Sequence, residues 1–157
     1  MELYKIKLQY VFRKGNARLN SNFTIAVHCL VYLAYLPGHM ASSEAIAHNV
    51  ATNPARIRKV MSALRNEGFV KTKEGVRGGY MLGEDPGKIT LGRVYEAFAR
   101  GALQPSWQTG DPQGGCPVSS NTQHVMTHIF REAEDSYASF LHQFTVAAVL
   151  LKIKADK

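Results

Sequence analysis

The chain has 157 residues, of which 45% are hydrophobic, so it can build a packed core and is too apolar for a disordered chain. Its formal net charge of +7 favours a polyanionic partner, with nucleic acid ahead of an acidic membrane surface. No apolar run approaches the ~20 residues that span a bilayer and no signal peptide is evident, so we expect a soluble, cytoplasmic protein without a membrane partner.

Residues 1–19 form an N-terminal extension whose structure the sequence leaves open. Five basic residues against one acidic residue give it a charge of +4, and its apolar residues alternate only weakly. This pattern is compatible with a strand, with a disordered arm, or with an extension foreign to the fold. We therefore place the start of the predicted fold at residue 20.

Three helices are predicted next, and each begins at a polar residue that can accept a hydrogen bond from the helix N-terminus. These N-caps are Ser21, Ser42 and Asn53. The first helix is apolar on nearly every side and should be buried, and the second is short. The third has the clearest bounds, because Pro54 occupies its first position and Gly68 closes it.

The third helix has an apolar stripe and an opposite face that is polar and basic. Its apolar residues recur at i, i+3, i+4 and i+7, which places Lys59 and Ser62 on the far side, with Arg56 and Arg58 on the flanks. Residues 53–80 hold seven basic and two acidic residues, a net charge of +5. An isolated helix of this kind is usually a surface helix with a solvated cationic face, so its meaning depends on its neighbours.

A β-hairpin is predicted directly after this helix. Residues 69–73 and 79–82 have the composition of two strands, and the turn between them is basic and rich in glycine. Glycines at such a tip permit positive φ angles and a close approach to a partner. The hairpin is thus the predicted wing of a helix-turn-helix.

The order helix, helix, basic helix and hairpin is typical of a winged helix-turn-helix that binds double-stranded DNA. The third helix of that fold enters the major groove, and the hairpin contacts the flanking backbone or the minor groove. The residues that we predict to bind DNA are Asn53, Arg56, Arg58, Lys59, Ser62, Lys73, Arg77, Gly78 and Gly79.

Two further helices and a loop complete the prediction. Thr90 caps a helix through Arg100, a loop dense in glycine and proline follows, and a long helix precedes a short last one capped by Thr145. The fold is therefore mainly α with a small β-hairpin. Its predicted parts are the extension (1–19), the winged helix-turn-helix DNA-binding domain (20–100), the linker loop (101–118), and the dimerisation helix with a short terminal helix (119–154).

The long helix carries an apolar stripe that spans roughly 27 Å at about 1.5 Å per residue. A domain of this size seldom exposes so much apolar surface, so the core, a partner subunit or both should cover it. The residues that we assign to dimerisation are Met126, Ile129, Phe130, Ala133, Tyr137, Phe140, Leu141 and Phe144.

The chain resembles the Rrf-two family of bacterial winged-helix regulators, the group that includes IscR, NsrR and CymR. The resemblance rests on the first helix (21–34), the third helix with its approach (52–68), the wing Arg77-Gly-Gly-Tyr-Met-Leu82 and the segment Lys88-Ile-Thr-Leu-Gly-Arg-Val94. Gly115-Cys-Pro-Val118 is similar to the YwnA-like branch. The family implies a homodimer, most often a repressor, that binds a pseudo-palindromic operator.

The sequence departs from many members of that family at the sensor. Those members hold an iron–sulfur cluster on three cysteines of the linker, whereas this linker has Cys116 alone, so we expect no cofactor. Cys116 is a possible redox sensor, because a thiolate near a helix start is stabilised, although an ordinary linker residue before a proline is the interpretation that the sequence favours. Cys29 belongs to an apolar helix and should be inert. The effector is unknown.

Two other groups of residues are candidates for a sensor site. His124 and His128 are four residues apart and have the spacing to chelate a metal, but without matching ligands they are more typical of two exposed histidines, and we assign no metal. Tyr95, Phe98 and Trp107 fit either a ligand pocket or ordinary packing.

Two alternatives to a DNA-binding regulator remain. An enzyme is disfavoured, because the sequence has no nucleotide loop, no Gly-x-Ser-x-Gly elbow, no His-Glu-x-x-His and no convincing carboxylate pair. Glu132, Glu134 and Asp135 are most simply a solvated helix face. The second alternative is a winged-helix protein-interaction module without specific DNA binding, against which the basic face argues.

Overall fold

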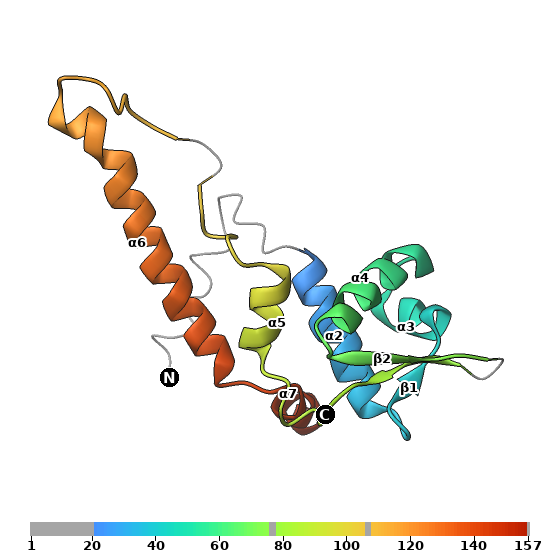
Figure 1. The fold of residues 1–157 in the computed structure, drawn as a ribbon. Coiled ribbons are helices and arrows are strands. Elements are labelled where there is room, and N and C mark those ends of the chain that lie inside the picture. Colours follow the sequence, from blue (N-terminus) through green and yellow to red (C-terminus); the bar gives the residue numbers. More distant parts are fainter. Residues whose placement is uncertain (1–20, 76–77, 106–107, 157) are drawn as a thin grey trace.

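The computed structural model describes residues 21–75, 78–105 and 108–156, and it has the predicted winged-helix class. The extension 1–19, Arg77 and Trp107 lie outside the described residues. In chain order (Figure 1), the elements are α2 (Ser21–Tyr35), β1 (Met40–Ala41), α3 (Ser43–Val50), α4 (Pro54–Asn66), β2 (Val70–Lys73), β3 (Gly79–Leu82), α5 (Leu91–Phe98), α6 (Pro117–His142) and α7 (Val146–Ala155).

The helix starts follow the predicted capping residues. The side chains of Ser42, Asn53 and Thr90 each accept a hydrogen bond from the backbone N–H three residues later, at 3.2, 2.8 and 3.2 Å. Thr145 does the same for α7, at 3.1 Å. Ser21 differs from the prediction, because it is the first residue of α2 and its hydroxyl accepts a hydrogen bond from Arg56.

The sheet has three antiparallel strands in the order β1-β3-β2, where only a two-stranded hairpin was predicted. The hairpin β2–β3 is confirmed. The unpredicted strand β1 pairs with the other edge of β3, where Met40 pairs with Met81 and Ala41 with Tyr80. A strand of two residues has no periodicity of its own, since it exists only through pairing with a distant segment. β2 is therefore an edge strand.

The core is built around α2, which lies between α5 on one side and α3 and α4 on the other, with α7 across its C-terminal end (Figure 1). This position explains why α2 is apolar on nearly every side. Its buried residues are Phe23, Ala26, Cys29, Leu30, Val31, Leu33 and Ala34. Burying an aliphatic side chain of this kind stabilises the fold by about 1.5–3 kcal/mol.

The long helix α6 extends away from this core, and only its C-terminal half packs against it (Figure 1). The three residues of α6 that are buried are Glu134, Ala138 and Leu141, and all of them lie in that half. Apolar side chains in the other half are exposed, with Val118 at 72%, Val125 at 52% and Ile129 at 50%. In the described chain, the N-terminal half of α6 is thus a projecting arm with an apolar face.

Candidate nucleic-acid interface

The helix α4 turns one face to the core and the other to solvent, as its pattern predicted. Ile57, Val60, Met61 and Leu64 are buried. This anchoring leaves Arg58 and Lys59 exposed, while Arg56 and Ser62 are half-buried at the edges of the outer face. The first turn of α4 therefore presents cationic side chains at the end where its unpaired backbone N–H groups also add positive potential.

Two of these cations already have partners within the chain. Arg56 donates from Nη2 to Ser21 Oγ at 2.6 Å, and Arg58 Nη1 lies 3.6 Å from Glu44 Oε1. Both side chains of the Arg58–Glu44 pair are more than half exposed, and an exposed pair of this kind contributes about 0–1 kcal/mol. A phosphate can therefore replace Glu44 as the partner of Arg58 at little cost.

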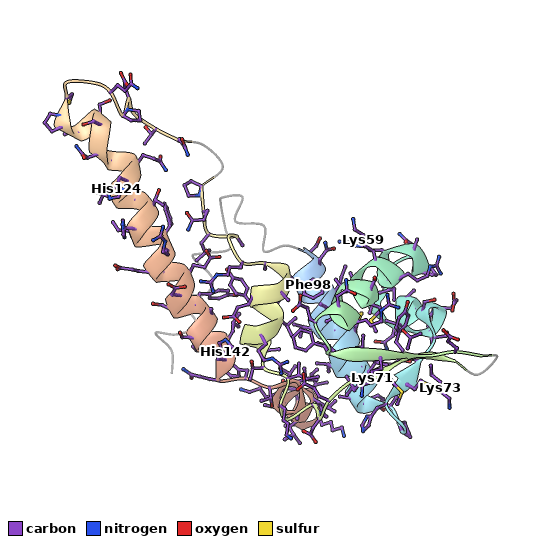
Figure 2. The ribbon with its side chains drawn as sticks, in the orientation of Figure 1. Lys59, Lys71, Lys73, Phe98, His124 and His142 are labelled. Atoms are coloured by element: carbon purple, nitrogen blue, oxygen red, sulfur yellow. The ribbon has the colours of Figure 1, made fainter. Side chains whose placement is uncertain are left out.

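Lys59 makes no ion pair among the described residues and lies on the outer face of α4. Lys71 and Lys73 on β2 are likewise exposed and unpaired there. Figure 2 shows these three lysines at the end of the molecule that faces away from α6. Lys71 was not among the predicted site residues, although an exposed cation on the wing strand was the signal for it.

The glycines of the wing have structural roles in this fold. A Cβ at Gly78 would overlap the carbonyl oxygen of Lys73, and one at Gly79 would lie 2.5 Å from the carbonyl oxygen of Ala41. Gly78 N also donates to Gly75 O at 2.8 Å and closes the turn. The sheet itself thus requires Gly78 and Gly79, and their predicted DNA contact stays a prediction. Arg77 lies outside the described residues.

Asn53 is also occupied within the chain. Its Oδ1 accepts the N–H of Arg56 at 2.8 Å and caps α4, which is worth about 1 kcal/mol. Its amide nitrogen has no hydrogen bond among the described residues, and the residue is exposed, so a donor is available beside the cationic turn. The structure thus shows a capping residue at the position where a DNA contact was predicted.

The predicted dimerisation residues differ in how far the core of the same chain covers them. Leu141 is buried within the chain, and Tyr137 packs edge-on against Tyr95 of α5 with ring centroids 5.0 Å apart, so the core covers this end of the stripe. Ile129 and Phe140 remain 50% and 42% exposed. The others, Met126, Phe130 and Phe144, are half-buried, and Ala133 is exposed.

One residue of α6 was wrongly expected to be solvated. Glu134 is only 5% exposed, and it accepts hydrogen bonds from Tyr95 Oη at 2.7 Å and from the backbone N–H of Gly101. Burial alone would raise the pKa of Glu134, but these hydrogen bonds, with one from Gln104, hold it below its ordinary value. The neighbouring Asp135 is exposed as expected and pairs with Arg100 at 2.9 Å.

The aromatic residues considered as a pocket serve mainly as packing. Tyr95 is fully buried and lies edge-on to Phe23 at 5.7 Å, and Phe98 packs against the core. Trp107 lies outside the described residues. Packing within the described chain therefore accounts for Tyr95 and Phe98 without a small-molecule ligand.

The two cysteines have opposite environments. Burial raises the pKa of Cys29 to about 12, so this thiol is inert as expected. Cys116 is exposed at the N-cap of α6, where hydrogen bonds from the backbone N–H groups of Ser119 and Val118 lower the pKa of its thiol. His124 and His128 are both exposed, as expected, with ring centroids 5.0 Å apart.

Comparison with known proteins identifies the family and supports the fold. The Rrf2 (Rrf-two) family, described as an iron-dependent transcriptional regulator, matches residues 19–152. A Synechocystis protein assigned as the HTH-type transcriptional regulator slr0846 is 30% identical over 83% of this chain and 85% of its own length, and Bacillus subtilis YwnA, assigned likewise, is 30% identical over 74% and 84%. A crystal structure of a Lactobacillus plantarum protein assigned as a transcriptional regulator has a TM-score of 0.74 and 27% identity, covering 85% of this chain and 89% of that one.

The residues of this chain do not fit the iron dependence in the family description. The chain has two cysteines, one buried in α2 and one exposed at the start of α6. Within the described ranges, no group of three or more histidine, cysteine, aspartate or glutamate residues is placed to hold a metal ion. A cluster held by three linker cysteines therefore has no ligand set here.

The residues that the structure describes include no helix that is long and apolar enough to cross a membrane.

Proposed function

The chain belongs to the Rrf2 family of transcriptional regulators, and we propose that it acts as a homodimeric repressor that binds a pseudo-palindromic operator through α4 and the wing. The observation that carries the proposal is the set of exposed lysines Lys59, Lys71 and Lys73, which lie on the two elements that a winged helix applies to DNA. The repressor role rests on the family resemblance.

The geometry supports separate tasks for the two elements. A helix fits the major groove with its N-terminal residues toward the base edges, so α4 would read sequence from the turn that contains Arg56, Arg58 and Lys59. The wing strand β2 is at the sheet edge with Lys71 and Lys73 exposed, a position suited to phosphate contacts, which set register and carry no sequence information.

The dimer is supported by the projecting half of α6. Val125 and Ile129 expose about half of their side chains on an arm that the described remainder of the chain leaves uncovered. Pairing two such arms would bury these residues, and each fully buried aliphatic side chain contributes about 1.5–3 kcal/mol. A dimer would also double the phosphate contacts and make DNA affinity steeply dependent on salt.

The proposal is tested by fluorescence anisotropy of the full chain with labelled DNA from upstream of its own gene and with an unrelated duplex of equal length, each across a salt series. We expect the upstream DNA to bind at least tenfold more tightly near physiological salt. Equal and salt-sensitive binding to both duplexes would leave only a polycation. Binding to neither duplex, with an intact dimer, would favour the protein-interaction module.

A further inference from the structure

The buried contact between α5 and α6 contains a hydrogen-bonded carboxylate, although apolar side chains alone could pack the two helices together. Glu134 is the charged side chain buried in the described core, and it takes hydrogen bonds from Tyr95 Oη at 2.7 Å, from the Gly101 N–H and from the Gln104 side chain. Tyr95 is itself fixed between Phe23 of α2 and Tyr137 of α6. One carboxylate therefore joins the winged-helix domain, the start of the linker and the long helix.

Such a contact specifies geometry more than it adds stability. A buried carboxylate loses its hydration, and replacing a buried charge network with apolar residues of similar size is often neutral or stabilising. A buried carboxylate must keep its donors, however, whereas apolar surfaces tolerate small shifts. The Glu134 carboxylate can accept both hydrogen bonds, from Tyr95 Oη and from the Gly101 N–H, at only one rotation and one tilt of α6. The contact therefore selects that rotation and that tilt.

The linker reinforces this single orientation. Its first residues are held by Glu134, and the exposed pair of Arg100 with Asp135 lies beside them at 2.9 Å. Two residues in its middle are held by the first turns of α6, where Thr109 N donates to Gln123 Oε1 at 2.9 Å and Asp111 N donates to Ser119 Oγ at 3.0 Å. The linker is thus hydrogen-bonded to α6 at its start and again in its middle.

A small error in tilt at Glu134 becomes large at the end of the arm. The stretch of α6 from Val118 to Glu134 is about 24 Å long at about 1.5 Å per residue. A tilt of about 10° at Glu134 moves the far end by roughly 4 Å over that length. This displacement is as large as the rise of one base pair along DNA, about 3.4 Å. A dimer assembled through these arms would change the separation of its two DNA-reading surfaces by a similar amount.

We propose that Glu134 is a positioning residue for DNA recognition, which sets the angle between α6 and the winged-helix domain and thereby the half-site spacing that the dimer accepts. This inference rests on the proposed function, because it requires two DNA-reading surfaces in one dimer. It assigns the residue no contact with DNA. Its signature is a change of spacing preference without a change of affinity for a single half-site.

The test uses a duplex that the wild-type protein selects from a random-sequence library, together with derivatives that carry one to four extra base pairs between the half-sites. We expect the wild type to favour its own spacing by at least tenfold over a one- or two-base-pair insertion. Glu134→Met and Tyr95→Phe keep the approximate shape of the core but each removes the hydrogen bond between the two side chains, and both should reduce that ratio to threefold or less. Their affinity for a single half-site should stay within twofold of the wild type.

The matched control is Glu132→Met, which makes the same substitution at an exposed position of the same helix and should keep the wild-type ratio. An unchanged ratio in Glu134→Met and Tyr95→Phe would overturn the inference. Equal loss of half-site affinity in both variants would also overturn it, because Glu134 would then support the domain as a whole. Failure of the wild type to select any duplex would count against the proposed function instead.

The angle itself is measured without DNA. Spin labels at Arg65→Cys on α4 and Arg131→Cys on α6, both exposed, report one distance within a protomer in the Cys116→Ser background, with labelled chains diluted into unlabelled protein. We expect a narrow distance distribution in the parent and a broader or shifted one in Glu134→Met and Tyr95→Phe. Identical distributions would overturn the inference even if no operator had been found.

Discussion

The imidazole of His142, the last residue of α6, lies over Gly92 in the first turn of α5 so closely that a methyl group at Gly92 would overlap its ring. The same ring has Nδ1 3.0 Å from Thr90 Oγ1 and Nε2 3.4 Å from Glu96 Oε1. This contact fixes the C-terminal end of α6 on α5, two turns beyond the Glu134 contact.

Gly92→Ala should therefore destabilise the protein, although alanine is the better helix former. Overpacking of this kind costs about 1–3 kcal/mol, and the displaced ring also loses its two polar partners. In the His142→Ala background the obstacle is absent, and the same substitution should be neutral or stabilising by up to about 1 kcal/mol. Urea unfolding of the wild type, the two single variants and the double variant at one protein concentration measures the coupling energy between the two positions. An equal cost in both backgrounds would show that the ring moves aside freely.

Cys116 should react with iodoacetamide at lower pH than an ordinary thiol. Hydrogen bonds from the backbone N–H groups of Ser119 and Val118 lower its pKa, so its reactive thiolate persists as the pH falls below the range of a free cysteine. Cys29, with a pKa of about 12 and a buried side chain, should stay unmodified in the folded protein.

Mass spectrometry of the alkylated chain separates the two thiols. The reference is the same protein in guanidinium chloride, where both cysteines should react with one ordinary pH profile. Native Cys116 with that same profile would contradict the lowered pKa. Native Cys29 that reacts as fast as Cys116 would contradict its burial.

Local signals in the sequence were sufficient for most of the winged helix. The caps Ser42, Asn53 and Thr90 act within three residues of themselves, so the pattern that identifies them is contiguous. β1 and Glu134 had no such signal. β1 consists of two residues whose strand character comes from β3, and Glu134 finds Tyr95 across 39 residues of chain. An acidic residue beside Glu132 and Asp135 is typical of a solvated face, and only the packing of α6 on α5 shows which of the three is buried.

The candidate site shows the same division between local and distant effects. Helical periodicity places Lys59 and Arg58 on the outer face of α4, because the opposite stripe must be buried. It does not indicate that Arg58 pairs with Glu44 of α3 or that Arg56 reaches Ser21 of α2. It also identifies the apolar stripe of α6 without separating Leu141, which the core covers, from Ile129, which stays exposed.

Ile129→Asp should weaken the dimer. Ile129 is 50% exposed on the projecting half of α6, and a two-fold contact would contain the residue twice. Losing two buried aliphatic side chains and burying two carboxylates should raise the dimer Kd by on the order of 100-fold or more. Sedimentation equilibrium over a range of concentrations measures the change.

The control for that experiment is His128→Asp, one residue away, about 100° around α6 from Ile129 and exposed. It introduces the same carboxylate outside the apolar stripe and should leave the dimer Kd within about threefold, or about 0.7 kcal/mol. If both variants formed dimers as stable as those of the wild type, α6 would be ruled out as the dimer interface. Equal weakening in both would point to a general loss of helix structure.

The two kinds of lysine should differ in how they affect DNA affinity. Lys73 on the wing is placed for a phosphate, so Lys73→Ala should lower affinity for operator and unrelated duplexes alike. It should also reduce the slope of log K against log salt by about 0.9 per contact, or about 1.8 for a dimer. Lys59→Ala, on the reading face of α4, should weaken operator binding more than binding to the unrelated duplex.

Arg131→Ala removes one exposed positive charge from α6 and serves as the control. If it lowered affinity and slope as much as Lys73→Ala does, the net charge of the chain would account for binding and the wing would have no special role.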